Sequence, residues 1–449
     1  MRRLIGIPLA FACGAFASVV LVRHAPHRFS VDVAQPLAVA TNWNAYGAWN
    51  VALLALTLLA AAIAYVAVLR APEPPSLRAS LAIAGVSLAT LWWYVPLFSS
   101  DLYAYAAYGE MSRLRIDPYH RALLPHANAL IDAARWQWSG AIPLCVYGAG
   151  FVAIARLLVT LVAPLGIVAQ LDAFRILSAC ALLLAGALLA HVGGDARRGR
   201  VAAAALLLNP VALWSANEGH NDTILIAIVL AGIVLIRRAP LVGAMLAALG
   251  ALVKAPAFVA ASALACDGLI MHVPTRRRLV LGAAIGATIA AAASRAWFDG
   301  VGGGVLPHGV YAPLASAHAL PVAFAHLVIA DTPVANAVGV VLAATWVLAL
   351  VAAASKRLRA RDRDGWMLLA FALWIAIPNP YPWYTLWLLP LVAFIRDPRL
   401  VTALIALSFV SLARYVPDAV GTPTTLGNLG LSIVAALPPL AVLCYNQRP

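Results

Sequence analysis

Residues 201–238 read VAAAALLLNPVALWSANEGHNDTILIAIVLAGIVLIRR. Within this segment, two apolar runs at 201–216 and 222–236 enclose a short polar turn, and two arginines follow the second run. Apolar runs of this kind predict membrane-spanning helices, although both are shorter than the roughly 20 residues that cross a bilayer comfortably. The polar turn and the arginine pair are therefore predicted to lie at opposite faces of a membrane.

The composition of the whole chain fits the same class of protein. Of its 449 residues, 63% are hydrophobic and 11% are charged, whereas soluble domains carry about 25% charged residues. A water-soluble fold could not bury so much apolar surface, but a bilayer accommodates it. The five cysteines are scattered and show neither a disulfide framework nor metal-ligand spacing. The composition excludes a soluble enzyme, a disordered tail and a fibrous repeat.

Apolar runs recur along the chain and predict an all-α polytopic membrane protein with about 12–14 transmembrane helices. We place approximate spans at 5–22, 48–69, 79–98, 172–191, 201–216, 222–236, 241–255, 256–272, 279–297, 333–354, 365–378, 383–395, 399–415 and 426–444. The stretches 241–272 and 365–395 also fit broken helices around a cavity. We find no fixed-period repeat and no low-complexity linker, so residues 1–449 are predicted to form a single transmembrane domain.

The basic residues gather in one alternating set of loops. Of the 31 lysines and arginines, 20 fall in or beside the segments 2–3, 70–78, 197–200, 237–238, 276–278, 356–363 and 396–399, or near the C-terminus. This positive-inside pattern predicts a cell (inner) membrane protein with both termini in the cytoplasm, and it accounts for the net charge of +14 without nucleic acid. The first span begins Met-Arg-Arg and has no small-residue cleavage site, so we expect a retained anchor.

The longest stretch without a predicted span, residues 99–171, then forms an external loop. If its apolar segment 141–164 crossed the membrane, the arginines at 197–200 would lie outside, so we predict a helix lying in the interface. Asp101 stands at the outer end of an aromatic-rich span, where partial desolvation tends to raise a carboxyl pKa toward the range of a general base. Alternatively, Asp101 caps the helix predicted over 102–114.

Two further polar features fall on the same face. The segment 217–222, Asn-Glu-Gly-His-Asn-Asp, suits polyhydroxyl binding or a divalent cation held through His220 and the carboxylates, but an ordinary turn with Asp222 as N-cap explains it equally well. Lys254 interrupts an apolar run, so it snorkels, pairs with an anion or faces a cavity. Together with Arg175 and Arg295 near outer span ends, Lys254 fits a phosphate pocket.

Four motifs in series between residues 90 and 390 resemble the polyprenol-phosphate-mannose-dependent α-1,6-mannosyltransferases of the GT-C class of membrane glycosyltransferases. They are Asp101-Leu-Tyr103-Ala-Tyr105 with Gly109 and Asp117-Pro118-Tyr119; Asn209-Pro210 with Gly219-His220-Asn221-Asp222; Lys254-Ala-Pro256; and Trp383-Tyr384-Thr-Leu-Trp387. Two positions depart from the family pattern. Arg115 stands where a glycine is usual, and Tyr147-Gly148-Ala149 stands where Tyr-Gly-Pro is usual.

The resemblance implies transfer of a sugar, mannose in this family, from a polyprenyl-phosphate donor to a glycan or glycolipid acceptor outside the membrane, with inversion. It implies Asp101 as the catalytic base. Lys254, and more weakly Arg175 and Arg295, would face the charge left on the phosphate. The implied substrate-binding residues are Tyr103, Tyr105, Asp117, Tyr119, Asn217, His220, Asn221, Asp222, Trp383 and Tyr384. The resemblance requires no cofactor, and binding of a divalent cation is an open alternative. A lipid-linked donor also needs no nucleotide-binding motif.

Two rival functions remain open at the level of sequence. A flippase or other transporter of a lipid-linked sugar would also bury charges and break helices, but its charges should line a path reaching both faces. A ligase or polymerase acting on lipid-linked oligosaccharide would share the chemistry but lacks the four motifs. For the aromatic residues Trp383, Tyr384 and Trp387, an interfacial aromatic belt is as good an explanation as sugar stacking.

Overall fold

The structure is a computed structural model, and it describes residues 2–21, 43–94, 99–120, 128–138, 142–192, 195–295, 325, 329, 332–376 and 381–412. The predicted last span at 426–444 and the proline-rich break at 378–380 lie outside these residues. Within the described residues every regular element is an α-helix or a 3-10 helix. The predicted all-α class is therefore confirmed, and the chain is a polytopic membrane protein.

The chain divides into two compact units, the first formed by residues 1–268 and 273–307 and the second by 269–272 and 308–449. The prediction of one transmembrane domain stays a prediction. The first unit contains α1 (Arg2–Leu21), α2 (Trp43–Leu69), α3 (Leu77–Leu91), α4 (Asp101–Arg113), α5 (Ala129–Gln137), α6 (Ala149–Leu161), η1 (Ala163–Leu165), α7 (Ile167–Val192), α8 (Ala196–Leu207), α9 (Pro210–Asn217), α10 (Asp222–Ile236), α11 (Pro240–Leu249), η2 (Gly250–Leu252), most of α12 (Pro256–Ile270) and α13 (Arg276–Ala293). The second unit contains α16 (Thr332–Arg359), α17 (Gly365–Ala376), η3 (Pro382–Trp387), η4 (Leu389–Ala393) and α18 (Pro398–Val410).

Three of the described helices are long and apolar enough to cross a membrane, in α2, α7 and α16, and a fourth span is possible if α8 and α9 count as one bent helix. Other apolar helices have 10–17 residues. The number of 12–14 spans stays a prediction. The helix α6 has 13 residues and is about 20 Å long, less than the roughly 30 Å of a hydrocarbon core. Its short length agrees with an interfacial helix, which also stays a prediction.

Two predicted spans are wrong as continuous α-helices. Residues 201–216 form α8 and α9, bent by 53°, because Pro210 cannot continue the hydrogen-bond ladder and the Asn209 side chain accepts the N–H groups of Val211 and Ala212. Residues 383–395 form the 3-10 helices η3 and η4. The predicted break in 241–272 is confirmed, since η2 ends before Lys254 and α12 begins at Pro256.

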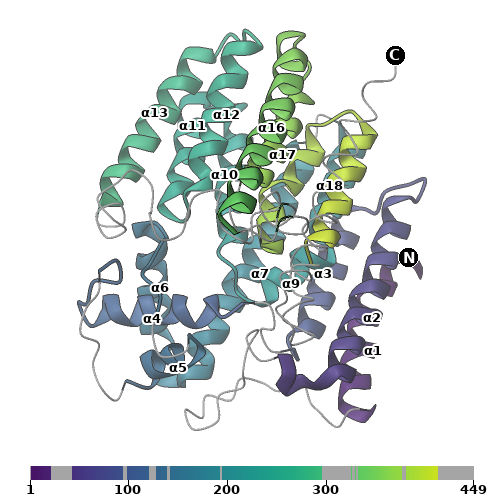
Figure 1. Ribbon diagram of the computed structural model, residues 1–449, viewed down its shortest axis with the longest axis vertical. Coiled ribbons are helices and arrows are strands. Elements are labelled where there is room, and N and C mark those ends of the chain that lie inside the picture. Colours follow the sequence, from purple (N-terminus) through teal and green to yellow (C-terminus); the bar gives the residue numbers. More distant parts are fainter. Residues whose placement is uncertain are drawn as a thin grey trace. The chain divides into compact units, whose positions relative to one another are not determined.

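Close helix packing brings the polar segments of the first unit together. In Figure 1, α10, α11 and α13 stand side by side, and α4 lies across their direction. Residues 102–111 of α4 are all buried, and a Cβ added at Gly109 would lie 2.5 Å from the Ala155 carbonyl oxygen of α6. Gly109 therefore lets α4 and α6 cross at close range, which explains the glycine of the first motif.

Candidate functional site

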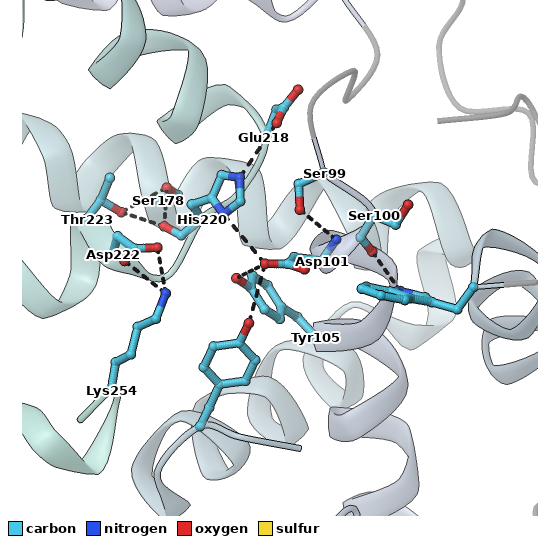
Figure 2. Close-up of polar contacts among 12 residues, drawn as sticks. Ser99, Ser100, Asp101, Tyr105, Ser178, Glu218, His220, Asp222, Thr223 and Lys254 are labelled. Carbon is cyan, nitrogen blue, oxygen red and sulfur yellow. Dashed lines mark hydrogen bonds and ion pairs between the residues drawn. The ribbon is translucent and has the colours of Figure 1, made fainter. Parts of the chain in front are cut away.

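The Asp101 carboxylate begins α4 and is held by two phenols. The hydroxyls of Tyr105 and Tyr147 donate to Asp101 Oδ2 at 3.3 and 3.4 Å. Within the described residues, Oδ1 accepts no hydrogen bond, and the side chain is 19% exposed. Figure 2 shows Asp101 between Tyr105 and His220. The carboxylate receives its hydrogen bonds from phenols rather than from the first amides of α4, so the alternative of a helix cap is not supported.

The helical spacing of the first motif separates its two tyrosines. Tyr105 is four residues after Asp101 and shares its helix face, whereas Tyr103, two residues after Asp101, points to another side. Both rings are buried. Tyr105 meets the Tyr147 ring edge-on, with centroids 5.1 Å apart. Tyr105 therefore lies at the carboxylate. The substrate-binding roles of Tyr103 and Tyr105 both stay predictions.

Tyr147 was not among the predicted site residues, although its motif was visible. Two hydrogen bonds hold its loop in place. The Tyr119 hydroxyl donates to the Tyr147 carbonyl at 3.1 Å, and the Gly148 N–H donates to the Val253 carbonyl at 3.1 Å. Burial, with the adjacent Asp101 charge, raises the pKa of the Tyr147 phenol far above its ordinary value. The phenol therefore stays protonated and acts as a hydrogen-bond donor to Asp101.

The segment of Asp117 supports this loop rather than lying beside Asp101. Asp117 Oδ1 accepts the Tyr119 N–H at 2.8 Å, and its Oδ2 lies 2.7 Å from His120 Nδ1. An aspartate that bonds the amide two residues on is a turn former. The Asp117 side chain is 44% exposed. Tyr119 thus reaches the site through the Tyr147 backbone, and direct substrate contact by Asp117 stays a prediction.

The second motif turns sharply at the end of α9. The N–H of Gly219 donates to the Ala216 carbonyl and that of His220 to the Ser215 carbonyl, the paired bonds of a Schellman cap. Gly219 has φ +77°, which favours glycine, and a Cβ there would meet Leu102 Cδ1 at 2.9 Å. The His220 carbonyl then accepts the Ser178 hydroxyl at 2.9 Å, which fixes the turn against α7.

His220 is fully buried between two carboxylates. Its Nδ1 lies 3.9 Å from Asp101 Oδ2, and its Nε2 lies 3.6 Å from Glu218 Oε2. The other Glu218 oxygen accepts the Trp214 indole N–H at 2.9 Å. Glu218 was named within the polar turn but not as a site residue, because the sequence does not show that it faces the same histidine as Asp101. Figure 2 shows this arrangement.

Lys254 is buried and pairs with Asp222. Its ammonium donates to both Asp222 oxygens, at 2.9 and 3.0 Å, and lies 5.5 Å from the centre of the Tyr147 ring. Asp222 is 0% exposed and the Lys254 side chain only 11%. The lysine therefore does not snorkel, and it forms the anion pair that was the alternative. Tyr147 lies between this pair and Asp101, so the three charged groups form one cluster.

Arg175 holds backbone segments together within the first unit. Its guanidinium donates to the carbonyls of Trp92, Tyr94 and Asn217, to the Asn217 side-chain oxygen at 2.6 Å, and to Asp172. A cation among carbonyls at the ends of α3 and α9 stabilises both helix ends. These bonds show a positioning role for Arg175. Its predicted contact with a phosphate stays a prediction, and the geometry favours Lys254 for it.

Asn221 is a buried amide with unused hydrogen-bonding capacity. It is 0% exposed, and within the described residues neither its side-chain nitrogen nor its oxygen has a hydrogen-bond partner. The side-chain nitrogen of Asn217, 2% exposed, also lacks one there. Buried amides are normally hydrogen-bonded, so such groups fit a polar ligand. Among the described residues, no group of three or more histidines, cysteines and carboxylates could hold a metal ion.

These residues lie within the part of the chain that matches a known family. The model of the N-terminal domain of the alpha-(1->6)-mannopyranosyltransferases matches residues 7–268, more than half of the chain. The chain belongs to this family. It is also similar to alpha-(1->6)-mannopyranosyltransferase A of Mycobacterium tuberculosis, with 28% identity over 364 residues that cover 74% of this chain and 68% of the relative. No solved structure matches it. The resemblance predicted from the motifs is confirmed, and the protein is a membrane mannosyltransferase.

The two departures from the family pattern have local explanations in this mannosyltransferase. Arg115 has φ +60° and follows α4 in a second Schellman cap, in which Ile116 donates to the Met111 carbonyl, so the position favours the usual glycine. Ala149 is the first residue of α6, where proline is well tolerated. Here its N–H donates to Ser294 Oγ at 3.3 Å, a bond that proline could not make.

The remaining predicted residues of the mannosyltransferase lie outside the matched region. Arg295 follows α13 directly after Ser294 and is exposed. In the second unit, Trp383 stacks on Tyr381 at 4.4 Å, and Tyr384 stacks on Trp387 at 4.3 Å. These rings use faces against one another, which accounts for the motif as a packed aromatic cluster. Sugar binding by Trp383 and Tyr384 stays a prediction.

Proposed function

We propose that this mannosyltransferase takes mannose from a polyprenyl-phosphate donor and transfers it to a hydroxyl of a glycan or glycolipid acceptor, at the external face of the inner membrane and with inversion. The observation that carries the proposal is the cluster in which Tyr147 stands between Asp101 and the Lys254–Asp222 pair. A group that accepts a proton and a group that balances a phosphate charge therefore lie on either side of one ring.

Asp101 is the proposed base. The acceptor O–H bond breaks and its proton bonds to the Asp101 carboxylate, while the acceptor oxygen attacks the anomeric carbon. The bond between that carbon and the phosphate oxygen breaks in the same displacement, and its electron pair leaves with the lipid phosphate. Attack opposite to the leaving group inverts the configuration. Oδ1, which accepts no hydrogen bond from the described residues, and the 19% exposure of the side chain suit contact with an acceptor hydroxyl.

Lys254 is the proposed counter-charge for the leaving phosphate. It pairs with Asp222 in the structure, and a phosphate entering beside Tyr147 would share its ammonium with that carboxylate. Arg295 is a second cation and is exposed. It follows Ser294, whose hydroxyl oxygen accepts the Ala149 N–H in the loop after Tyr147. Lysine suits this position because its ammonium is a compact charge that several anions can share.

The buried amides are the proposed sugar contacts. Asn221 offers two N–H donors and an oxygen acceptor, and Asn217 offers its side-chain nitrogen, none of them bonded within the described residues. Mannose is a polyhydroxyl ligand whose hydroxyls both donate and accept hydrogen bonds. Asn221 stands between His220 and Asp222 in the chain, and Asn217 begins the same polar turn, so this assignment keeps the sugar near Asp222.

The ends of two helices support the external placement of the site. α10 runs from Asp222 at the site to Ile236, after which Arg237 and Arg238 follow. α13 begins with Arg276–Arg278 and ends at Ala293, and the next residue, Ser294, accepts the Ala149 N–H of the site loop. Arginine clusters thus lie at the helix ends opposite the site, and such clusters mark the cytoplasmic face.

The test is transfer by the purified full chain in lipid, offered polyprenyl-phosphate mannose or GDP-mannose with a panel of glycan acceptors. We expect a glycosylated product only with the lipid-linked donor, and an inverted anomer by NMR. Turnover with GDP-mannose in a preparation free of polyprenyl phosphate would contradict the donor assignment. Movement of the lipid-linked sugar across vesicles without any transfer would favour a flippase.

A separate test addresses the side of the membrane. In a variant whose native cysteines are replaced, a cysteine at exposed His120 should react with an impermeant thiol reagent added outside cells, whereas one at exposed Arg277 should not. Ser100 and Asn221 are unsuitable for labelling because they are buried. Labelling of Arg277→Cys alone from outside would invert the proposed orientation.

A further inference from the structure

His220 and Glu218 form an array behind the proposed base. From α9 to α4 the groups follow in the order Trp214, Glu218, His220 and Asp101, with separations of 2.9, 3.6 and 3.9 Å between successive polar atoms. Each ring nitrogen of His220 faces a carboxylate oxygen, and the ring is fully buried. Substrate binding needs only to shorten the last two separations, since catalytic hydrogen bonds are often long in unliganded enzymes.

We propose that Glu218 and His220 form a proton relay behind Asp101, with His220 receiving the proton that Asp101 takes from the acceptor. This inference rests on the proposed function, because it requires Asp101 to be the base. Glu218 is a positioning residue in it, and His220 acts through Asp101 without touching the sugar or the acceptor. The relay gives His220 a role other than the sugar binding that the family resemblance implies.

Glu218 sets the state of the histidine. The Trp214 indole N–H holds one Glu218 oxygen, which leaves the other directed at His220 Nε2. Both ring nitrogens face a carboxylate, but the Glu218 oxygen is the nearer of the two, at 3.6 Å against 3.9 Å for Asp101, so the relay assigns the hydrogen to Nε2 and leaves Nδ1 as an acceptor. His220 Nδ1, which faces Asp101, is then the acceptor. The third group in a Ser-His-Asp arrangement orients its histidine in the same way.

The proton balance of the relay is simple. Asp101 gains one proton as the acceptor O–H bond breaks, and a half-turn of the carboxyl group brings that proton to face His220. It then moves to Nδ1, so that Asp101 is again an anion and His220 is an imidazolium beside the Glu218 carboxylate. The buried Glu218 charge is balanced in that state, which favours it. After product release the proton returns through Asp101, whose side chain is partly exposed.

The lysine pair supplies a contrast within the same turn. Asp222, two residues after His220, accepts hydrogen bonds from the Lys254 ammonium on both of its oxygens. The two carboxylates that do face His220 come from different segments, Asp101 from α4 and Glu218 from the end of α9. His220 therefore joins the first and the second of the four motifs, because its ring faces carboxylates on both sides.

The experiment is a double-mutant cycle on kcat with saturating lipid donor. His220→Gln should lower kcat by about 10²-fold and Glu218→Gln by about tenfold, both with KM for donor and acceptor unchanged. The double variant should be no slower than His220→Gln, since Glu218 acts through His220. Glu110→Gln, a matched change of a buried glutamate that instead bonds Arg113 and Asn128, should keep wild-type kcat.

Effects that multiply in the double variant, or losses confined to KM, would overturn the relay. Should His220→Gln fail to fold, Glu218→Gln decides alone, because an unchanged kcat in that variant also overturns it. Asp101→Asn separates the two proposals. A dead Asp101→Asn variant beside active His220→Gln and Glu218→Gln variants rejects only the relay, whereas an active Asp101→Asn variant rejects the base and the relay with it.

Discussion

Asp101 and Asp222 each begin a helix and both lie at the site, yet their surroundings are opposite. Asp222 is fully buried and receives two bonds from one ammonium. Asp101 is partly exposed and receives its bonds from two neutral phenols. A carboxylate paired with a buried lysine is neutralised, and protonating it would leave the lysine charge unbalanced. Neutral donors leave the Asp101 charge in place and its side chain is partly exposed, so of the two aspartates Asp101 is the proposed base.

The largest effect should come from removing that proton acceptor. Asp101→Asn keeps the size of the side chain and its hydrogen bonds from Tyr105 and Tyr147, but it cannot accept a proton. We expect kcat for mannosyl transfer to fall by about 10²–10⁴-fold, with normal expression and thermal stability. Asp117→Asn is the control, since an asparagine keeps the turn at Pro118. Equal losses from the two variants would contradict the comparison.

Breaking the other carboxylate's pair should act first on stability. Lys254→Met leaves Asp222 charged and buried, and should lower the free energy of unfolding by about 3–5 kcal/mol. The double variant with Asp222→Asn should recover most of that loss without restoring transfer. Lys254→Arg should restore transfer only in part, because the two cations differ in shape and hydration. Thermal melting in detergent, together with transfer assays, would check these outcomes. A double variant as unstable as Lys254→Met would show that the pair is not the cause.

The turn that presents Asp222 should be more sensitive than its sequence suggests. Gly219→Ala places a Cβ 2.9 Å from Leu102 Cδ1 at φ +77°, and we expect a loss of about 2 kcal/mol in stability. Because Gly219 precedes His220, the variant should also reduce transfer. A melting temperature equal to that of the wild type would mean that the turn relaxes easily.

At the end of the helix that presents Asp101, a substitution to glycine should stabilise the protein, and its effect should be the smallest of the four. Arg115 closes α4 in the same kind of cap but with a strained φ of +60°. Arg115→Gly should therefore stabilise the protein by about 1 kcal/mol and leave kcat unchanged. Thermal melting again measures the difference. A destabilised glycine variant would indicate that contacts of the arginine side chain outweigh the strain.

Much of the first unit could be predicted from local pattern. The predicted span 222–236 has the same bounds as α10, and the helix predicted over 102–114 appears as Asp101–Arg113. The break between α8 and α9 was missed, although Asn209-Pro210 is a recognised stop and start signal. The apolar character of the run outweighed that signal, since hydropathy averages over a window and does not register one missing N–H donor.

The amino-acid sequence by itself determined the membrane class and the family, and it supplied most of the residues proposed for the site, because apolar run length, charge asymmetry and motif spacing are properties of neighbours in the chain. Only the tertiary structure decided which of those residues meet. Lys254 pairs with Asp222, 32 residues away in the sequence, and Tyr147 hydrogen-bonds to Asp101, 46 residues away. Such pairings depend on how closely helices cross, as at Gly109 and Gly148. The division between a neutralised carboxylate and an available one follows from that packing, since identical side chains differ only in the partners that it brings to them.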